Sequence, residues 1–357
     1  MKALVAYGNT VDDLRLTDIP VPEIGEDEVL VKVRAAGICG SDIGRWILAP
    51  STEPFTARPY VGGHEFAGDV VKIGKYVTGW SVGDRVVSDN TAEACGVCAA
   101  CAKGDYLNCN SRKAIGYPPH DGGFAEYVRI PGTILRLNPN SLMKIPPNVS
   151  YEEASILDPV CNAYQAVIQQ SHLLPGDDAL FYGPGPLGLF GVQFAKLMGC
   201  RNIIVVGTPS DKDIRLSVAK KYGATHILIN GQDDIPARVR EICGPQGLGT
   251  VFDFAGPAVI TEQAIAMLRR GGEVIRIGIH RRPTETGNYV PLITKAITMR
   301  GHMGYDTTSW LQSMRLLEAG MIDDVKSEIT HELPLEQWRE GMELMRTQEA
   351  IKVVLHP

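Results

Sequence analysis

The 357-residue sequence contains no apolar run long enough to cross a membrane, since its longest such runs are four to six residues. It also lacks an excess of basic residues: 35 Lys and Arg stand against 41 Asp and Glu, a net charge of −6. A nucleic-acid-binding surface needs clustered positive charge, so neither nucleic acid nor a membrane is expected as a partner. Internal repeats and low-complexity segments are also missing. The remaining class is a globular protein whose length favours two domains, or one domain with a large insertion.

The N-terminus does not resemble a signal peptide. The stretch MKALVAYG is interrupted by Gly8 and Asn9 before it reaches the length of an apolar signal region, and it is more typical of a first β-strand. We therefore expect a cytoplasmic protein whose thiols stay reduced. This expectation argues against disulfides among the eight cysteines of the chain.

Half of these cysteines lie in the short segment 95–109, with the spacing Cys-x2-Cys-x2-Cys-x7-Cys. In a reducing compartment such spacing is more typical of a metal site than of disulfides, with iron–sulfur ligation and inert thiols as the alternatives. Zinc takes four thiolates tetrahedrally, and Gly96 and Gly104 give the loop the freedom to turn them inward. The segment predicts a closed, structural zinc site held by Cys95, Cys98, Cys101 and Cys109.

The pattern of secondary structure changes along the chain. The first 150 residues are rich in Gly, Pro and short β-branched runs such as EVLVKV and GDVVKI, which is typical of an irregular β-barrel. From about Asp177, short apolar strands alternate with helical patterns at 187–199 and 213–223, which predicts a doubly wound parallel sheet. Beyond Lys295 the sequence predicts a strand at 297–301, amphipathic helices at 309–320 and 335–347, and a last strand at 350–355. The predicted fold class is α/β.

A glycine motif stands at the start of the alternating region. Gly183, Gly185 and Gly188 form GxGxxG directly after a predicted strand and at the beginning of a predicted helix. The motif alone is weak, but its strand–helix context is that of a dinucleotide-binding unit. Its glycines let the backbone approach a pyrophosphate, whose charge lies at the helix N-terminus. We expect Pro186 and Leu187, between the last two glycines, to share in cofactor binding.

Two short motifs in the first half suggest a second metal site. GICGSD contains Cys39, and GGHEFAG contains His64 and Glu65. Singly, a buried cysteine usually packs in a core and a histidine usually makes structural hydrogen bonds. Glycines flank each candidate, however, and a dinucleotide fold follows. A catalytic zinc needs three protein ligands and an open position, which a thiolate, an imidazole and a carboxylate would supply.

Together these motifs resemble the zinc-dependent medium-chain dehydrogenase/reductase family over essentially the whole chain. GHEFAGDVVKIGKYV, from Gly63 to Val77, is similar to the family's zinc signature, and segment 95–109 is similar to its structural zinc lobe. The resemblance implies a GroES-like catalytic domain over 1–155, a Rossmann NAD(P)-binding domain over 156–294, and a return to the catalytic domain over 295–357. It also implies a homodimer or homotetramer.

The resemblance implies a role for each site residue. Cys39 and His64 correspond to catalytic zinc ligands, Asp158 to the third ligand, and Glu65 to a carboxylate that exchanges with water at the metal. Asp158 precedes Pro159 and also suits a helix N-cap, a role that does not exclude ligation. Two zinc ions per chain follow. Ser41 corresponds to the first acceptor of the alcohol proton. Many relatives carry a relay histidine further along, where this chain has Gly44.

The implied reaction is hydride transfer between NAD(P) and a secondary alcohol, polyol or sugar-derived alcohol, with zinc as the Lewis acid. Tyr305 resembles the polyol branch, although Gly304 stands where relatives there have an arginine. Asp158-Pro159 and segment 121–128 resemble threonine dehydrogenases, so an amino-alcohol substrate stays open, with a non-catalytic zinc module as a remote alternative. Trp46 is expected either to line the substrate pocket or to pack in the core.

The cofactor preference depends on the end of the second Rossmann strand. NAD-binding folds usually place an acidic residue there to hold the ribose 2′-hydroxyl. Here the position is Gly207, 24 residues after Gly183, so no carboxylate repels a 2′-phosphate. NADP is therefore favoured over NAD, and four nearby residues offer hydroxyls or positive charge to the phosphate: Thr208, Ser210, Lys212 and Arg215. Asp211 argues for NAD, because a longer loop would return its carboxylate to the ribose. Lys212 and Arg215 are alternatively a solvated helix face.

Overall fold

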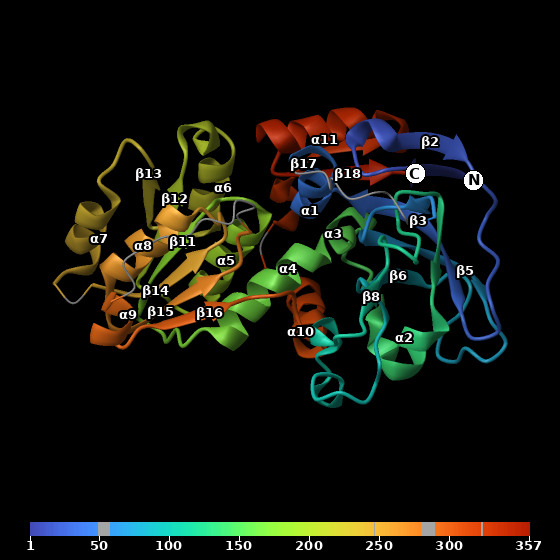
Figure 1. The fold of residues 1–357 in the computed structure, drawn as a ribbon, viewed down its shortest axis with the longest axis horizontal. Helices are drawn as coiled ribbons and strands as arrows, with labels where there is room; N and C mark the ends of the chain where they lie inside the picture. The colour runs from blue at the N-terminus through green and yellow to red at the C-terminus, as the bar shows by residue number, and fades with distance from the viewer. Residues whose placement is uncertain (49–57, 246, 280–289, 323) are drawn as a thin grey trace. The chain divides into compact units, whose positions relative to one another are not determined.

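The computed structural model describes residues 1–48, 58–245, 247–279, 290–322 and 324–357. The chain divides into two compact units (Figure 1). Unit 1 comprises Met1–Asp158, Tyr305–Glu318 and Asp324–Pro357, and unit 2 comprises Pro159–Gly304 and Ala319–Asp323. Within the described residues, the structure has no helix with the length and apolar character that a membrane span requires.

Unit 1 is built mainly from β-strands. Its largest sheet has the order β10-β6-β5-β3-β18-β17, with β9 also pairing with β3, and a smaller sheet has the order β2-β1-β4. A further pair is formed by β7 and β8. The strands are β1 (Lys2–Ala6), β2 (Leu14–Asp18), β3 (Val29–Gly37), β4 (Tyr60–Val61), β5 (Glu65–Ile73), β6 (Arg85–Ser88), β7 (Thr91–Glu93), β8 (Lys113–Ala114), β9 (Tyr127–Ile130), β10 (Leu142–Lys144), β17 (Ile329–Pro334) and β18 (Lys352–His356).

The core of unit 1 forms because β3 is apolar and β-branched. Val29, Val31 and Val33 are buried in a cluster that also contains residues of β18 and of the C-terminal helix α11. Antiparallel pairing of β18 with β3 joins the end of the chain to its beginning. The helices with residues in unit 1 are α1 (Gly40–Ile43), α2 (Gly132–Leu137), α3 (Tyr151–Ser155), α4 (Leu157–Tyr164, which continues into unit 2), α10 (Thr307–Glu318) and α11 (Trp338–Thr347).

Unit 2 contains a six-stranded sheet with the order β13-β12-β11-β14-β15-β16, and every adjacent pair is parallel. Its strands are β11 (Asp178–Tyr182), β12 (Asn202–Gly207), β13 (His226–Ile229), β14 (Leu248–Asp253), β15 (Leu268–Arg276) and β16 (Thr298–Gly301). The connecting helices are α5 (Pro186–Leu197), α6 (Arg215–Tyr222), α7 (Ile235–Cys243), α8 (Ala258–Met267) and α9 (Val290–Thr294). This is the doubly wound order, and the predicted α/β fold class is confirmed.

The sheet order explains where a ligand of unit 2 is held. The strand order reverses next to β11, and ligands of such sheets bind beyond the carboxyl ends of the strands at that point. The Gly183 loop leaves the carboxyl end of β11. Two boundaries differ from the expected divisions at 155/156 and 294/295, and unit 2 begins at Pro159. Because β16 pairs with β15, the chain returns to unit 1 only at Tyr305.

Candidate active site

Cys39 lies at the turn between β3 and α1. The backbone N–H of Cys39 donates a hydrogen bond of 3.0 Å to Oδ2 of Asp42, so a carboxylate one turn ahead fixes the start of the helix. Asp42 itself is buried, which anchors this short helix to the interior of unit 1. The thiol of Cys39 is thus presented from a rigid turn although the segment is short.

His64 and Glu65 begin β5, and glycines on both sides make room for them. Gly63 has a φ of +86°, and a Cβ at this position would lie 2.7 Å from the ring of Phe124. Gly37 faces Glu65 across the β3–β5 pair, where any Cβ would overlap the Glu65 carboxylate. His64 and Glu65 are 5% and 2% exposed. The flanking glycines therefore allow two polar side chains to be buried at the end of a sheet.

The three predicted side chains converge. One ligand atom each from Cys39, His64 and Glu65 lies within 4.8 Å of the others. Burial by itself lowers the pKa of His64, but the interactions with Tyr117, Cys39 and Asp42 outweigh it and raise this pKa well above its ordinary value. The Asp42 carboxylate lies 3.9 Å from Nδ1 of His64, beyond hydrogen-bond distance but close enough for charge attraction. A thiolate, an imidazole and a carboxylate in a negative environment fit a zinc ion.

A lysine that the sequence analysis missed completes this group. Nζ of Lys352, on β18, forms an ion pair of 2.5 Å with Oε2 of Glu65, and both side chains are almost fully buried. Burial lowers the pKa of Lys352, but the charges of Glu65 and Cys39 raise it overall. Glu65 therefore has a buried ammonium group as its partner while it lies with Cys39 and His64.

Ser41 and a second missed residue, Tyr117, lie beside the group. The hydroxyls of Ser41 and Tyr117 are 3.4 Å apart, and the Tyr117 ring lies 5.5 Å from the His64 ring between centroids. Gly44, the position of the relay histidine in many relatives, is buried in the turn Gly44–Leu48. Tyr117 comes from the loop after β8, and no sequence motif links it to Ser41.

The four cysteines of segment 95–109 also lie together, with ligand atoms within 4.8 Å of one another. The Cys95 N–H donates to the Cys109 sulfur at 3.3 Å, and the Cys101 N–H donates to the Cys98 sulfur at 3.5 Å. Backbone hydrogen bonds from Val97 and Cys98 lower the pKa of Cys95 to about 6. All eight cysteines are free. Four thiols gathered in one loop, with backbone N–H groups donating to two of them, suit a four-thiolate zinc site.

In unit 2, the Gly183 loop has the form that a pyrophosphate requires. Gly183 has a φ of +90°, and a Cβ on Gly188 would overlap the carbonyl oxygen of Gly183. Within the described residues, a Cβ on Gly185 would meet no atom within 4 Å, so the space before the helix is open. Gly185 is the N-cap of α5, with Pro186 at its first position and Leu187 following. The loop presents backbone N–H groups at a helix N-terminus.

Comparisons with known proteins agree with both units. The family model of the alcohol dehydrogenase GroES-like domain matches residues 25–140, and that of the zinc-binding dehydrogenase matches residues 186–319. The zinc-type alcohol dehydrogenase-like protein YdjL of Escherichia coli K12, itself uncharacterised, is 43% identical over 99% of this chain and 98% of its own length. Sorbitol dehydrogenase of Halalkalibacterium halodurans is 33% identical over 100% of this chain and 99% of its own length.

The structure of 2R,3R-butanediol dehydrogenase from Bacillus subtilis superposes with a TM-score of 0.87 and 26% identity, covering 100% of both chains. The chain belongs to the zinc-dependent medium-chain dehydrogenase/reductase family. The predicted family, its GroES-like and Rossmann folds, and its oxidoreductase activity as an alcohol or polyol dehydrogenase are confirmed.

Asp158, the counterpart of the family's third ligand, lies outside the 4.8 Å group. Its Oδ2 atom accepts hydrogen bonds from Asn90 Nδ2 at 3.0 Å and from Tyr305 Oη at 3.1 Å. Burial, and then the charge of Glu65, raises the pKa of Asp158. The structure thus places Glu65 with Cys39 and His64 and anchors Asp158 beside them. Trp46 is 2% exposed and belongs to the core cluster of unit 1, so it packs as core.

The end of β12 departs from the family members that carry an acidic residue there. Gly207 ends the strand, and Asp211 lies four residues further along the chain. The Asp211 carboxylate is buried and accepts hydrogen bonds from Thr208 N at 2.8 Å and from Thr208 Oγ1 at 2.7 Å. Arg215 lies against the same carboxylate at 3.4 Å and is itself largely buried, so it is not a solvated face. Thr208, Ser210 and Lys212 are exposed.

Proposed function

We propose that this enzyme oxidises a secondary alcohol group of a polyol or sugar-derived alcohol, and reduces the matching ketone, with NAD(P) as the hydride carrier. The observation that carries the proposal is the convergence of Cys39, His64 and Glu65 within 4.8 Å in a buried site. The open glycine loop of unit 2 supports the cofactor. The small-molecule partner is an alcohol or ketone.

We propose two zinc ions per chain. Cys95, Cys98, Cys101 and Cys109 hold the structural ion, while Cys39, His64 and a carboxylate hold the catalytic one. When bound, the catalytic zinc acts as a Lewis acid toward the substrate oxygen. Glu65 and Asp158 share the carboxylate position. When Glu65 is not a zinc ligand, its ion pair with Lys352 holds it in the site. Hydrogen bonds from Asn90 and Tyr305 orient Asp158.

The proton of the alcohol leaves through hydroxyl groups. Ser41 Oγ accepts it while passing its own proton to Tyr117 Oη, 3.4 Å away, and the partly exposed Tyr117 passes its own proton to water. A phenol both donates and accepts, so Tyr117 extends the path at the point where Gly44 offers no side chain. Catalytic hydrogen bonds are often long without substrate and shorten when it binds.

The preference for NADP rests on what the end of β12 exposes. Thr208, Ser210 and Lys212 are exposed there, whereas the Asp211 carboxylate is buried and already accepts hydrogen bonds from Thr208. Arg215 is engaged with Asp211, so Lys212 is the cation that meets a 2′-phosphate. Lys and hydroxyl groups are suitable phosphate donors.

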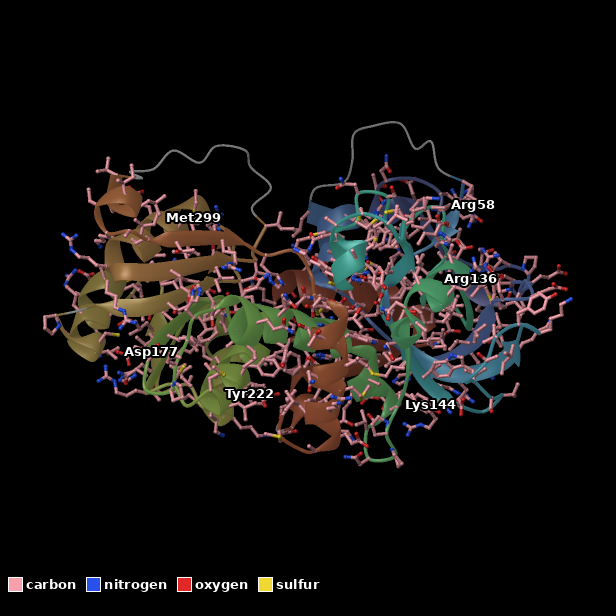
Figure 2. All side chains as sticks on the ribbon, turned by 90° about the horizontal axis from the view of Figure 1, so that it is seen from below. Arg58, Arg136, Lys144, Asp177, Tyr222 and Met299 are labelled. Atoms are coloured by element: carbon pink, nitrogen blue, oxygen red, sulfur yellow. The ribbon has the colours of Figure 1, made fainter. Side chains whose placement is uncertain are left out.

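A homodimer or homotetramer is proposed through β16. This strand is last in the order of its sheet, and all four of its residues are exposed. Figure 2 labels Met299 on this strand, and 44% of that residue is exposed. An exposed edge strand offers unpaired backbone groups that a second copy of the chain can extend.

The test is a substrate panel on zinc-loaded protein with NAD and NADP separately, containing simple secondary alcohols, diols, polyols and L-threonine. Turnover of polyols or diols is expected, with a higher kcat/KM for NADP. Turnover of L-threonine alone would move the enzyme to the amino-alcohol dehydrogenases. A lack of turnover with every alcohol would refute the proposed function.

A further inference from the structure

Arg45 is a partly buried cation next to the candidate active site. It lies in the turn Gly44–Leu48 that follows α1. Its guanidinium carbon is 5.0 Å from the centre of the Tyr117 ring and 5.5 Å from that of the Tyr60 ring. Within the described residues, no carboxylate lies within ion-pair distance of it. Two aromatic rings therefore hold a positive charge for which the described residues supply no ion-pair partner.

Tyr117 connects this cation to the reaction centre. The Tyr117 ring is a neighbour of both the guanidinium, at 5.0 Å, and the His64 imidazole, at 5.5 Å, and its hydroxyl lies 3.4 Å from that of Ser41. The carboxylate of the neighbouring turn, Asp42, is buried against His64 and the Cys39 N–H instead. Arg45 thus lies about one side chain away from the groups that would hold the reacting alcohol.

Two exposed arginines of unit 1 are instead paired with acids. Arg58 and Arg136, both labelled in Figure 2, are exposed and form ion pairs with Asp121 and Asp27. Arginine held on aromatic faces keeps its five in-plane N–H groups for other partners. Partial burial of a cation without a counter-ion costs free energy, which an anionic ligand recovers.

We propose that Arg45 binds an anionic group of the substrate, a phosphate monoester or a carboxylate, at the end of the polyol remote from the oxidised carbon. The inference rests on the proposed polyol dehydrogenase function and narrows its substrate class to polyol phosphates or sugar acids. Guanidinium matches both oxyanions through paired N–H···O bonds, so the chemistry of recognition is shared.

The experiment compares kcat/KM for sorbitol and D-arabitol with that for their terminal phosphates and for gluconate, using zinc-loaded wild-type enzyme. Wild type prefers one anionic series. Arg45→Gln lowers the ratio of anionic to neutral kcat/KM by about 10- to 100-fold, as expected for hydrogen bonds to a charged group. Arg45→Lys retains part of the ratio. A higher kcat/KM for the terminal phosphates identifies a phosphate monoester as the recognised group, and a higher kcat/KM for gluconate identifies a carboxylate.

Two controls separate this role from others. Arg136→Gln removes a surface cation of the same unit and keeps the wild-type ratio. Tyr117→Phe keeps the ring under Arg45 and also keeps the ratio, while it lowers kcat for both series. A wild-type enzyme that turns over neutral polyols equally well would overturn the inference and leave the proposed function standing. An equal loss on both series in Arg45→Gln, or a loss of cofactor affinity instead, would also overturn it.

Discussion

Glu328 is a fully buried carboxyl group whose effect on stability can be predicted. It ends the turn Val325–Glu328 before β17, is 0% exposed, and neither carboxyl oxygen has a hydrogen-bond partner among the described residues. Burial raises its pKa well above the ordinary value, and the charge of Lys352 only partly opposes this. Ionisation of Glu328 therefore costs folding free energy.

Replacing Glu328 with leucine should stabilise the protein. Replacing buried charged groups with apolar residues of similar volume commonly gains about 1–4 kcal/mol, which corresponds to a Tm increase of about 2–16 °C at this domain size. The gain depends on pH. A carboxyl whose folded pKa is raised contributes its full stability below its unfolded pKa of about 4.3, and loses it as pH rises toward the folded pKa. The increase in Tm should thus be larger at pH 8 than at pH 5.

The assay is thermal unfolding of zinc-loaded protein from pH 5 to pH 9, for wild type, Glu328→Leu and Glu328→Gln. Glu340→Gln, which changes an exposed glutamate of α11, is the matched control and should leave the pH profile as in wild type. A loss of stability in Glu328→Leu at every pH would refute the reasoning, because it would mean that the carboxylate has a stabilising partner in solution.

Four further changes have defined outcomes. Cys101→Ser should remove one zinc and lower Tm by several degrees, because a structural zinc contributes folding free energy; metal analysis and unfolding check this. Gly188→Ala should abolish cofactor binding, measured by fluorescence titration, since a Cβ there overlaps the Gly183 carbonyl. Lys212→Ala should raise KM for NADP about tenfold and leave KM for NAD almost as it was, as steady-state kinetics would show. Tyr117→Phe should lower kcat about 10- to 100-fold with little change in KM, and a solvent isotope effect would report the altered proton step.

Sequence reasoning worked best where a function depends on local geometry. The glycines of GxGxxG and the four clustered cysteines lie close together in the sequence, and their spacing already determines what they can hold. The placement of Cys39 with His64 also followed from short motifs, because each motif carries its own glycine turn. The strand–helix alternation of unit 2 was similarly visible, because each apolar segment is a complete element.

The remaining features depend on contacts between distant segments. Lys352 reaches Glu65 only because β18 pairs with β3, and nothing in the local sequence AIKVVL marks this lysine as part of the site. Tyr117 meets Ser41 through a loop that no periodicity describes. Asp211 resembles a ribose-binding acid in sequence, yet its capping interactions with Thr208 bury it. Strand pairing placed Lys352, the path of a loop placed Tyr117, and helix capping buried Asp211, and none of these three contacts is visible in the local sequence.

The central claim is that Cys39 and His64 hold a catalytic zinc apart from the structural one. Zinc content and X-ray absorption, measured together with turnover on wild type and Cys39→Ala, test it most directly. The account predicts two zinc ions per wild-type chain, one of them in a sulfur-only shell. In Cys39→Ala it predicts a single sulfur-bound zinc, an almost unchanged Tm and no turnover. One zinc in the wild type, or an active Cys39→Ala variant that still binds two, would contradict it.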